Sequence, residues 1–199
     1  MRIKGVCDVR IASNRDTWEK RHCVEEAGAA EPSVIEFLPL LPRGRALDIA
    51  AGKGRNSIVL ARSGIHVVAV DWSENAMSSL ALTAQRDELE IEPIIADLEE
   101  SLPFRPGSFD IVLNVSFLDR GLFPSLKKVV RTGGMLLFDT FLIDQAASGH
   151  PSDPRFLLGH YELPDLLSDM ELIRYREGIV DYGGAKRAWR ATALARRTA

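Results

Sequence analysis

The sequence predicts an α/β fold in which helices cover both faces of a doubly wound sheet of about seven strands, the last of them antiparallel. Short apolar runs alternate with helical patterns between residues 45 and 141, which is typical of a parallel sheet. The runs are almost continuously apolar, as expected for strands buried on both faces. Gly183-Gly184 separates two further strand-like runs and predicts a terminal hairpin. The fold class is therefore Rossmann-like.

The N-terminal part is expected to form a helical flank or lid. The stretch from Asn14 to Gly28 has capping residues at its start and a glycine at its end, which indicates a helix. Ser33 is predicted to cap a short helix over residues 34–38, which prolines then end. We expect one domain over residues 1–199, with 1–42 as the flank or lid and 43–199 as the α/β core.

The core elements follow from apolar runs and from capping residues. Glycines stop a helix that begins at Arg55, Ser73 caps a second helix, and Gly133-Gly134 ends a third. The expected helices cover residues 55–63, 73–89, 122–131 and 163–168, and the expected strands cover 46–50, 66–70, 92–96, 109–115, 135–141, 171–180 and 187–196. Basic residues of 186–197 alternate with apolar ones and are expected on the solvent face of the last strand.

Composition limits the function classes. The 199 residues are 46% hydrophobic and 27% charged, with a net charge of −3, as in soluble globular proteins. A dedicated nucleic-acid binder is usually basic, so no nucleic-acid partner is expected. No apolar window is long enough to span a membrane and no signal peptide is found, so we expect no membrane association and a cytoplasmic location. Two cysteines and four scattered histidines provide no metal-ligand spacing, so no metal is expected.

The stretch from Asp48 to Ser57 lies where the first core strand gives way to a helix. Gly52 and Gly54 allow a tight turn and a close approach of a ligand. The N-terminus of the following helix attracts a carboxylate or a phosphate. Asp48 just before the loop would repel a pyrophosphate but would attract an ammonium. A ligand that carries both a carboxylate and an amine, such as the methionine moiety of S-adenosylmethionine, matches both features.

Two further acids close the next two strands. Asp71 ends the second strand, where a carboxylate can accept hydrogen bonds from both ribose hydroxyls. Asp97 ends the third strand, where it can accept a bond from an adenine amino group, while Trp72 or Leu98 covers the faces of the ring. Each acid alone could be a helix cap or an ordinary loop residue. Together they predict a nucleoside-type ligand at one edge of the sheet.

The pattern resembles the class I S-adenosylmethionine-dependent methyltransferases. Their first motif matches Asp48-x-Ala50-x-Gly52-x-Gly54, with alanine in place of the first glycine, which implies an ordinary backbone angle at Ala50. Their ribose acid matches Asp71, their adenine acid matches Asp97, and their motif at the end of strand four matches Asn114. The resemblance covers residues 45–141 and implies S-adenosylmethionine as the cofactor.

Within this family the loop is similar to that of the tellurite-resistance methyltransferases, whose Gly-x-Gly-Arg-Asn-Ser is present here and includes Arg55 and Asn56. The histidine that those enzymes carry before the last strand has no counterpart in residues 181–187, so their substrate is not carried over. The cofactor-binding residues implied are Asp48, Ala50, Gly52, Gly54, Arg55, Asn56, Asp71, Trp72, Asp97, Leu98 and Asn114.

The sequence gives fewer signals for the methyl acceptor than for the cofactor. No Asn-Pro-Pro-Tyr or Asp-Pro-Pro-Tyr follows strand four, so amino groups of nucleic acids or proteins are not indicated. The N-terminal flank and the loop from Asp144 to Tyr161 are expected to build the acceptor pocket. His150 in that loop is the candidate general base, with an exposed loop histidine as the alternative. We expect a small-molecule acceptor.

Two alternative functions stay open at this point. Gly52-x-Gly54-x-x-Ser57 is one residue away from a dinucleotide-binding fingerprint, which would indicate an NAD(P)-dependent oxidoreductase. A non-catalytic protein that binds S-adenosylmethionine would carry the same cofactor motifs. The position of Asp48 and the reversed terminal strand favour a methyltransferase over the oxidoreductase.

Overall fold

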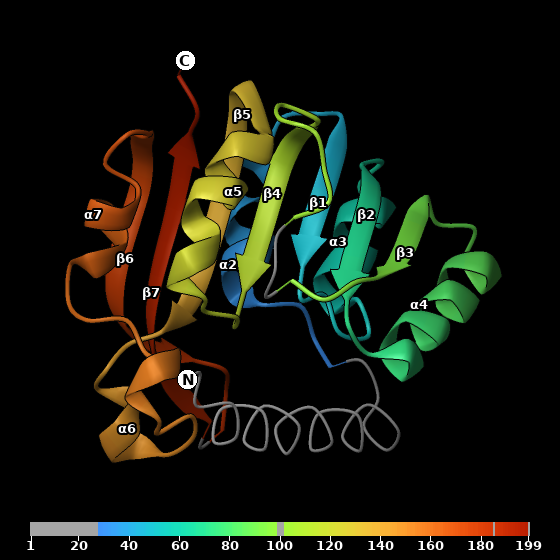
Figure 1. The fold of residues 1–199 in the computed structure, drawn as a ribbon. Coiled ribbons are helices and arrows are strands. Elements are labelled where there is room, and N and C mark those ends of the chain that lie inside the picture. The colour runs from blue at the N-terminus through green and yellow to red at the C-terminus, as the bar shows by residue number, and fades with distance from the viewer. Residues whose placement is uncertain (1–27, 99–101, 185, 199) are drawn as a thin grey trace, which may run out of the picture.

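A computed structural model describes residues 28–98, 102–184 and 186–198, which form a seven-stranded sheet with the order β3-β2-β1-β4-β5-β7-β6 (Figure 1). The strands are β1 (Arg45–Ile49), β2 (His66–Asp71), β3 (Ile91–Ile95), β4 (Phe109–Val115), β5 (Val130–Phe141), β6 (Glu171–Asp181) and β7 (Arg187–Arg196). β1 to β5 pair in parallel, whereas β7 is antiparallel to both of its neighbours, β5 and β6. The fold class predicted from the sequence is confirmed, including the reversed last strand.

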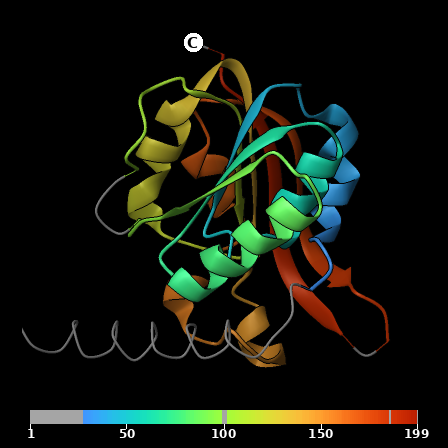
Figure 2. The same cartoon turned by 90° about the vertical axis from the view of Figure 1, so that its right-hand side faces the viewer.

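Helices cover both faces of this sheet (Figures 1 and 2). One face carries α2 (Pro32–Phe37), α3 (Arg55–Arg62) and α4 (Glu74–Arg86). The other carries α5 (Phe123–Val129) and α7 (Glu162–Leu166). The remaining elements are α6 (Gln145–Ser148) and the 3-10 helices η1 (Leu38–Leu40), η2 (Arg120–Leu122) and η3 (Pro154–Phe156). The sheet is thus the middle of three layers, which explains why its strands are apolar on both sides.

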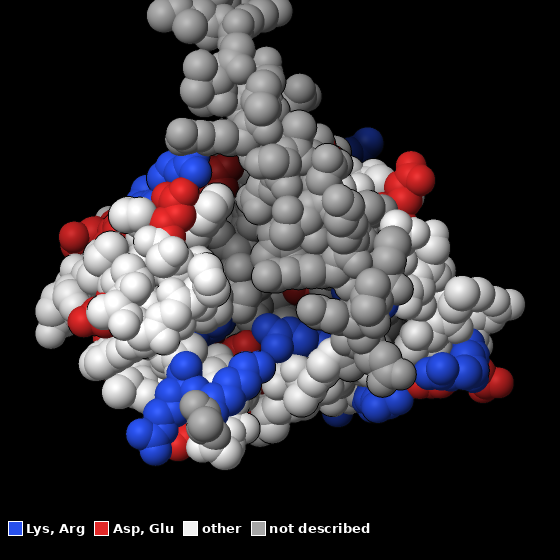
Figure 3. All heavy atoms as spheres, turned by 90° about the horizontal axis from the view of Figure 1, so that it is seen from below, with Lys and Arg blue, Asp and Glu red and all other residues white. Residues whose placement is uncertain are grey.

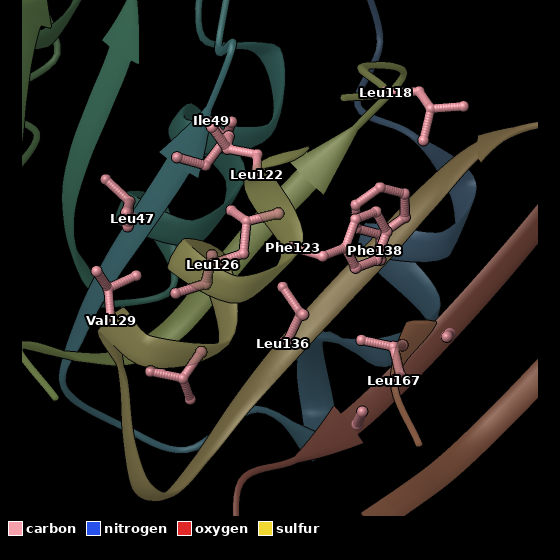
Figure 4. Close-up of a cluster of buried hydrophobic side chains, with 14 of the residues drawn as sticks. Leu47, Ile49, Leu118, Leu122, Phe123, Leu126, Val129, Leu136, Phe138 and Leu167 are labelled. Carbon is pink, nitrogen blue, oxygen red and sulfur yellow. The ribbon is translucent and has the colours of Figure 1, made fainter. Parts of the chain in front are cut away.

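The larger hydrophobic cluster joins the sheet to α5 and α7 (Figure 4). Leu47 and Ile49 of β1 face this side, and Phe123 stacks on Phe138 of β5 with ring centroids 4.7 Å apart. Full burial of a side chain of this size stabilises the fold by roughly 1.5–3 kcal/mol. This packing holds the carboxyl ends of β1 and β4 in fixed positions, and those ends carry the candidate site.

Several predicted boundaries are corrected by long-range pairing. The helix predicted over 122–131 ends at Val129, because Val130 already pairs with Phe109 as the start of β5. β5 therefore begins five residues earlier than predicted and includes Gly133-Gly134. The helix that Ser73 caps ends at Arg86 rather than near residue 89, and Glu88 follows with a left-handed φ of +52°. The cap itself is confirmed, since the Ser73 hydroxyl accepts from the Ala76 N–H at 3.1 Å.

The prediction that Ser33 caps α2 is wrong. The helix begins at Pro32 after Glu31, and Ser33 lies in its first turn, 1% exposed. Proline at the first helical position needs no N–H partner there, so it starts the helix without a side-chain cap. The helix predicted from Asn14 lies in residues 1–27, outside the described residues, as does most of the predicted flank or lid.

None of the helices in the described part of the chain has the length and apolar character needed to cross a bilayer. Within the same ranges no group of three or more His, Cys, Asp or Glu side chains is arranged to hold a metal ion.

Candidate functional site

The predicted site residues gather at the carboxyl edge of the parallel strands. Strand register aligns Ile49 of β1 with Asn114 of β4 on one side and with Val70 of β2 on the other. Asp71 and the loop after β1 therefore end side by side at the lower edge of the sheet in Figure 1. This is the edge at which ligands bind in open α/β sheets.

Asp48 is a buried carboxylate with one unsatisfied oxygen. It is 1% exposed, and the Ser57 hydroxyl donates to its Oδ2 at 2.6 Å. Its Oδ1 has no hydrogen-bond partner within the described residues. Burial raises the pKa of Asp48 to about 6, against the opposing effects of the Ser57 bond and the Arg55 charge. Because unsatisfied buried polar atoms are rare, this oxygen fits a site for a ligand cation such as an ammonium.

The loop after β1 turns through left-handed backbone angles. Gly52 has a φ of +54° and Gly54 a φ of +76°. The Ala51 N–H donates to the Val70 carbonyl at 3.0 Å, and the Gly54 N–H donates to the Ala51 carbonyl at 2.9 Å. A Cβ on Gly54 would lie 2.3 Å from Leu80 Cδ1 of α4. Its backbone angle therefore favours glycine at position 54, and any larger residue would also require Leu80 of α4 to shift.

The expectation of an ordinary backbone angle at Ala50 is wrong. Its φ is +51°, in the left-handed region that the family's glycine would occupy freely. A side chain with a Cβ is destabilised there by roughly 1–2 kcal/mol. The hydrogen bond of the next residue, Ala51, to β2 fixes the path of the chain, so the loop keeps its shape despite the alanine.

Asp71 closes the loop onto β2. Its Oδ2 accepts from the Gly52 N–H at 2.8 Å, and its Oδ1 accepts from the Ser73 N–H at 2.9 Å. An ionised carboxylate has about four lone-pair sites, so about two are left for other donors. The residue is 4% exposed, and its geometry fits an acceptor for ribose hydroxyls while it also holds the glycine loop in place.

Arg55 and Asn56 lie at the start of α3 and contact the segment before α2. The Arg55 guanidinium pairs with Glu31 at 2.9 Å and donates to the Ala29 carbonyl at 3.3 Å. The Asn56 Oδ1 accepts from the Glu31 N–H at 3.0 Å. Both side chains therefore link the loop to residues 29–31, a role that the sequence did not indicate.

The other predicted cofactor residues differ in exposure. Trp72 is partly exposed directly after Asp71, and Asp97 is exposed two residues beyond the end of β3. Leu98 is 6% exposed and belongs to the large hydrophobic cluster. Asn114 is buried, and its Nδ2 donates to the Phe117 carbonyl at 2.6 Å, which holds the turn after β4.

Arg190 of β7 is a residue that the sequence interpretation missed. It was expected on a solvent face, but it is 2% exposed and its Nε donates to Asp139 Oδ1 at 2.6 Å. Burial opposes the charge, but the adjacent carboxylates outweigh it and raise the pKa of Arg190. A second carboxylate, that of Glu31, lies 3.9 Å away and accepts from the Tyr182 hydroxyl. The alternating pattern of β7 did not reveal this, because the neutralising residue lies on another strand.

The loop after β5 holds two histidines in different surroundings. His150, the predicted base candidate, is exposed. His160 lies between Glu177 of β6 and Asp144, with its two ring nitrogens 2.9 Å from one oxygen of each. The hydrogen bond to Glu177 is the main cause that raises the pKa of His160, and Asp144 adds to it. His160 therefore fastens this loop to β6, whereas the contacts among the described residues assign no role to the His150 ring.

A methyltransferase domain model matches residues 46–134. A demethylmenaquinone methyltransferase of Clavibacter sepedonicus is 38% identical over 103 residues, which are 49% of this chain and 41% of the relative. TehB of Haemophilus influenzae, a probable S-adenosyl-L-methionine-dependent methyltransferase, is 25% identical over 159 residues, 76% of this chain and 54% of the relative. The crystal structure of that TehB matches with a TM-score of 0.71 over 85% of this chain and 63% of TehB.

These matches confirm the resemblance that the sequence indicated, and they favour a methyltransferase over the oxidoreductase alternative. The matched stretches cover only about half of the curated relatives' lengths, 41% and 54%. The expected exclusion of nucleic acid is not supported. An 18S rRNA (guanine(1575)-N(7))-methyltransferase of Saccharomyces cerevisiae is 35% identical over 83 residues, 41% of this chain and 29% of the relative.

Proposed function

We propose that the chain is a class I S-adenosylmethionine-dependent methyltransferase and that it transfers a methyl group from S-adenosylmethionine to a small-molecule acceptor. The methyltransferase domain match over residues 46–134 and the fold support this proposal. The observation that carries the proposal is the buried Asp48 carboxylate, whose free oxygen lies at a glycine loop that Asp71 closes. A cation, a carboxylate and a ribose can then be bound at one edge.

Each site residue has a proposed part in cofactor binding. Asp48 attracts the ammonium, the N-terminus of α3 attracts the carboxylate, and Asp71 accepts from the ribose hydroxyls. Asp97 accepts from the adenine amino group, with Trp72 or Leu98 against the ring. The remaining proposed residues shape the loop, brace it or hold the turn after β4, and they are Ala50, Gly52, Gly54, Arg55, Asn56 and Asn114.

The reaction needs little from the protein besides positioning. The cofactor supplies a methyl group on a positively charged sulfur. The acceptor's electron pair forms the new bond while the carbon–sulfur bond breaks with its electrons on sulfur, and any acceptor proton leaves to solvent. The chain holds the methyl donor and the acceptor in line. This lowers the activation free energy of methyl transfer, because the translational and rotational entropy of the two reactants is lost on binding and not in the chemical step. A thiolate acceptor needs no base, whereas a hydroxyl acceptor would need one, for which His150 is a candidate.

The class of acceptor is the less constrained part of the proposal. Figure 3 views the molecule from the side of the carboxyl edge, and on the described surface that is visible there Lys and Arg occur together with Asp and Glu. That mixture supports a small acceptor over a polyanion, which binds through a single-sign patch. Transfer of a labelled methyl group to low-mass compounds but not to RNA would support the small-molecule acceptor. Transfer to RNA alone would favour a nucleic-acid acceptor, and no turnover with intact binding would favour a non-catalytic binder.

Titration calorimetry tests the cofactor assignment. We expect micromolar binding of S-adenosylmethionine and S-adenosylhomocysteine, no binding of NAD, and a loss of at least about 100-fold in affinity for Asp71→Ala. That loss is about 2.7 kcal/mol, because the variant removes the ribose acceptor and releases the Gly52 N–H. Glu74→Ala is the matched control, since it removes an exposed acid three residues further on. Binding of NAD alone would contradict the proposal.

The affinity for S-adenosylmethionine should depend on pH below neutrality. The pKa of Asp48 is about 6, and an ammonium binds its ionised form. The ammonium keeps its charge up to about pH 7, so affinity should stay nearly constant between about pH 6.5 and 7 and fall toward 10-fold per pH unit well below the pKa of Asp48, whereas a decline above about pH 7.5 would belong to the ligand's amino group. Calorimetry between pH 5 and 8 in ~0.5-unit steps would measure this. Asp48→Asn should bind more weakly and lose the dependence, and an unchanged profile in that variant would assign the titration elsewhere.

A further inference from the structure

Ser116, the residue after β4, combines an exposed side chain with a left-handed backbone. Its φ is +60°, a conformation that residues other than glycine rarely adopt. Its N–H donates to the Asp139 carbonyl at 2.7 Å, which fixes the turn. Residues with strained backbone angles are enriched at functional sites. The Ser116 hydroxyl is therefore a candidate for binding a ligand.

A buried guanidinium lies behind this hydroxyl. Arg190 Nη2 is 3.0 Å from Ser116 Oγ, while its Nε is bound to Asp139. Asp139 is itself 1% exposed and accepts from the Thr192 hydroxyl at 2.8 Å through its other oxygen. The Arg190 guanidinium also lies 4.3 Å from the centre of the Phe141 ring. The guanidinium that contacts Ser116 is therefore held in place by Asp139 and by the Phe141 ring.

This contact sets the direction of the Ser116 hydrogen bond. A guanidinium only donates, so the Ser116 oxygen accepts from Arg190. The hydroxyl proton must then point to a different partner, and in the described part of the chain no residue accepts it. An exposed hydroxyl whose oxygen is bound to a cation is a stronger donor than an ordinary serine. Ser116 thus offers a directed donor next to the edge that carries the cofactor loop.

The charges around Ser116 indicate which kind of ligand group its hydroxyl can bind. Arg190 lies against Asp139 and near Glu31, and Glu31 is paired with Arg55. These two cations and two anions balance, so no excess positive charge is available for a multiply charged anion. A single directed donor in balanced surroundings suits one hydroxyl or carbonyl oxygen.

We propose that Ser116, positioned by Arg190, donates a hydrogen bond to a hydroxyl or carbonyl oxygen of the methyl acceptor and so selects acceptors that carry such an oxygen beside the reacting atom. The inference rests on the proposed methyl transfer and names the acceptor class for that site. Ser116 would touch the substrate, whereas Arg190 acts through Ser116.

The test uses two thiols, because a thiol ionises without a general base. Ortho-hydroxythiophenol and ortho-methylthiophenol place groups of similar size beside the sulfur, and only the first offers an oxygen. We expect Ser116→Ala to lower kcat/KM for the hydroxy compound about 5- to 20-fold and to leave the methyl compound within about 2-fold. Ser116→Gly should act in the same way although it relieves the backbone strain. Ser78→Ala, a change at an exposed helical serine, should alter neither.

Arg190→Lys provides the test of positioning. It keeps the charge beside Asp139 but lacks the second nitrogen that reaches Ser116, so it should lower the hydroxy-to-methyl ratio of kcat/KM and leave the dissociation constant of S-adenosylmethionine unchanged. Equal losses for both thiols in the Ser116 variants would overturn the inference, as would a wild-type protein that binds the cofactor but methylates neither. Absence of cofactor binding would instead overturn the proposed function, and the inference would fall with it.

Discussion

Replacing Gly54 by alanine is expected to abolish detectable binding of S-adenosylmethionine and to destabilise the fold. The residue has a φ of +76°, where a Cβ costs roughly 1–2 kcal/mol. Its Cβ would also overlap Leu80, whose Cδ1 and Cδ2 would lie 2.3 and 2.7 Å away. Overlap of this kind typically adds 1–3 kcal/mol, so we expect a loss of about 2–5 kcal/mol in the free energy of unfolding. Either Leu80 or the start of α3 must shift to relieve the overlap, and because Leu80 is fully buried we expect α3 to shift and the cofactor loop to move with it.

The chain offers a matched control in Gly133. Its φ of +79° is almost the same, but a Cβ there would have nothing within 4 Å. Gly133→Ala should therefore show only the backbone cost, roughly 1–2 kcal/mol, with the affinity for S-adenosylmethionine unchanged. Urea denaturation and calorimetry of both variants separate the two effects. Equal losses of stability in the two variants would mean that Leu80 adjusts freely, and Leu80→Ala added to Gly54→Ala should then restore nothing.

Some features of the candidate site depend only on residues close together in the sequence, and their positions could be predicted from local sequence signals. Asp48, Gly52 and Gly54 lie where a strand-to-helix loop was expected, and Ser73 caps α4 by bonding a residue three positions on. Asp71 lies at a strand end aligned with that loop because parallel strands of similar length end at one edge. Hydrophobic run length and glycine position carry this information directly.

Properties that depend on distant partners could not be predicted in this way. Arg190 sits in an alternating stretch typical of an exposed strand face, yet Asp139, 51 positions earlier, neutralises it in the core. Ala50 takes a left-handed angle because the following residue bonds to β2. Ser33 lies inside a helix because Pro32 starts it. In each case a tertiary contact or a neighbour's geometry outweighs the preference of the residue itself.

Glu31 shows how these distant contacts join the two halves of the site. Its N–H and its carboxylate bind Asn56 and Arg55 at the cofactor loop, and the same carboxylate accepts from Tyr182 of the terminal hairpin. The residue is 2% exposed. A charge at this depth is tolerated because several donors surround it. The segment before α2 is thereby fastened to both the first and the last parts of the core.

Replacing Asp139 by asparagine is expected to cost about 3–5 kcal/mol in the free energy of unfolding, because it leaves the Arg190 charge buried without its principal partner. For a chain of this size the thermal midpoint should fall by roughly 6–20 °C. Asp169→Asn is the matched control, since Asp169 pairs with Lys127 at 2.5 Å but has 63% of its side chain exposed, and its loss should stay below about 1 kcal/mol.

The origin of this loss can be separated from the loss of packing. Replacing Asp139 and Arg190 together by leucine and methionine removes both charges and should recover most of the stability, because a buried ion pair is seldom more stable than well-packed apolar residues. The double variant would still lack the group that holds Ser116. Thermal denaturation of Asp139→Asn, of Asp169→Asn and of the double variant shows whether the unpaired buried charge causes the loss of stability. If Asp139→Asn is no more destabilising than Asp169→Asn, the Glu31 carboxylate 3.9 Å from Arg190 suffices to hold the buried charge, and Asp139 matters only for the direction of its hydrogen bonds.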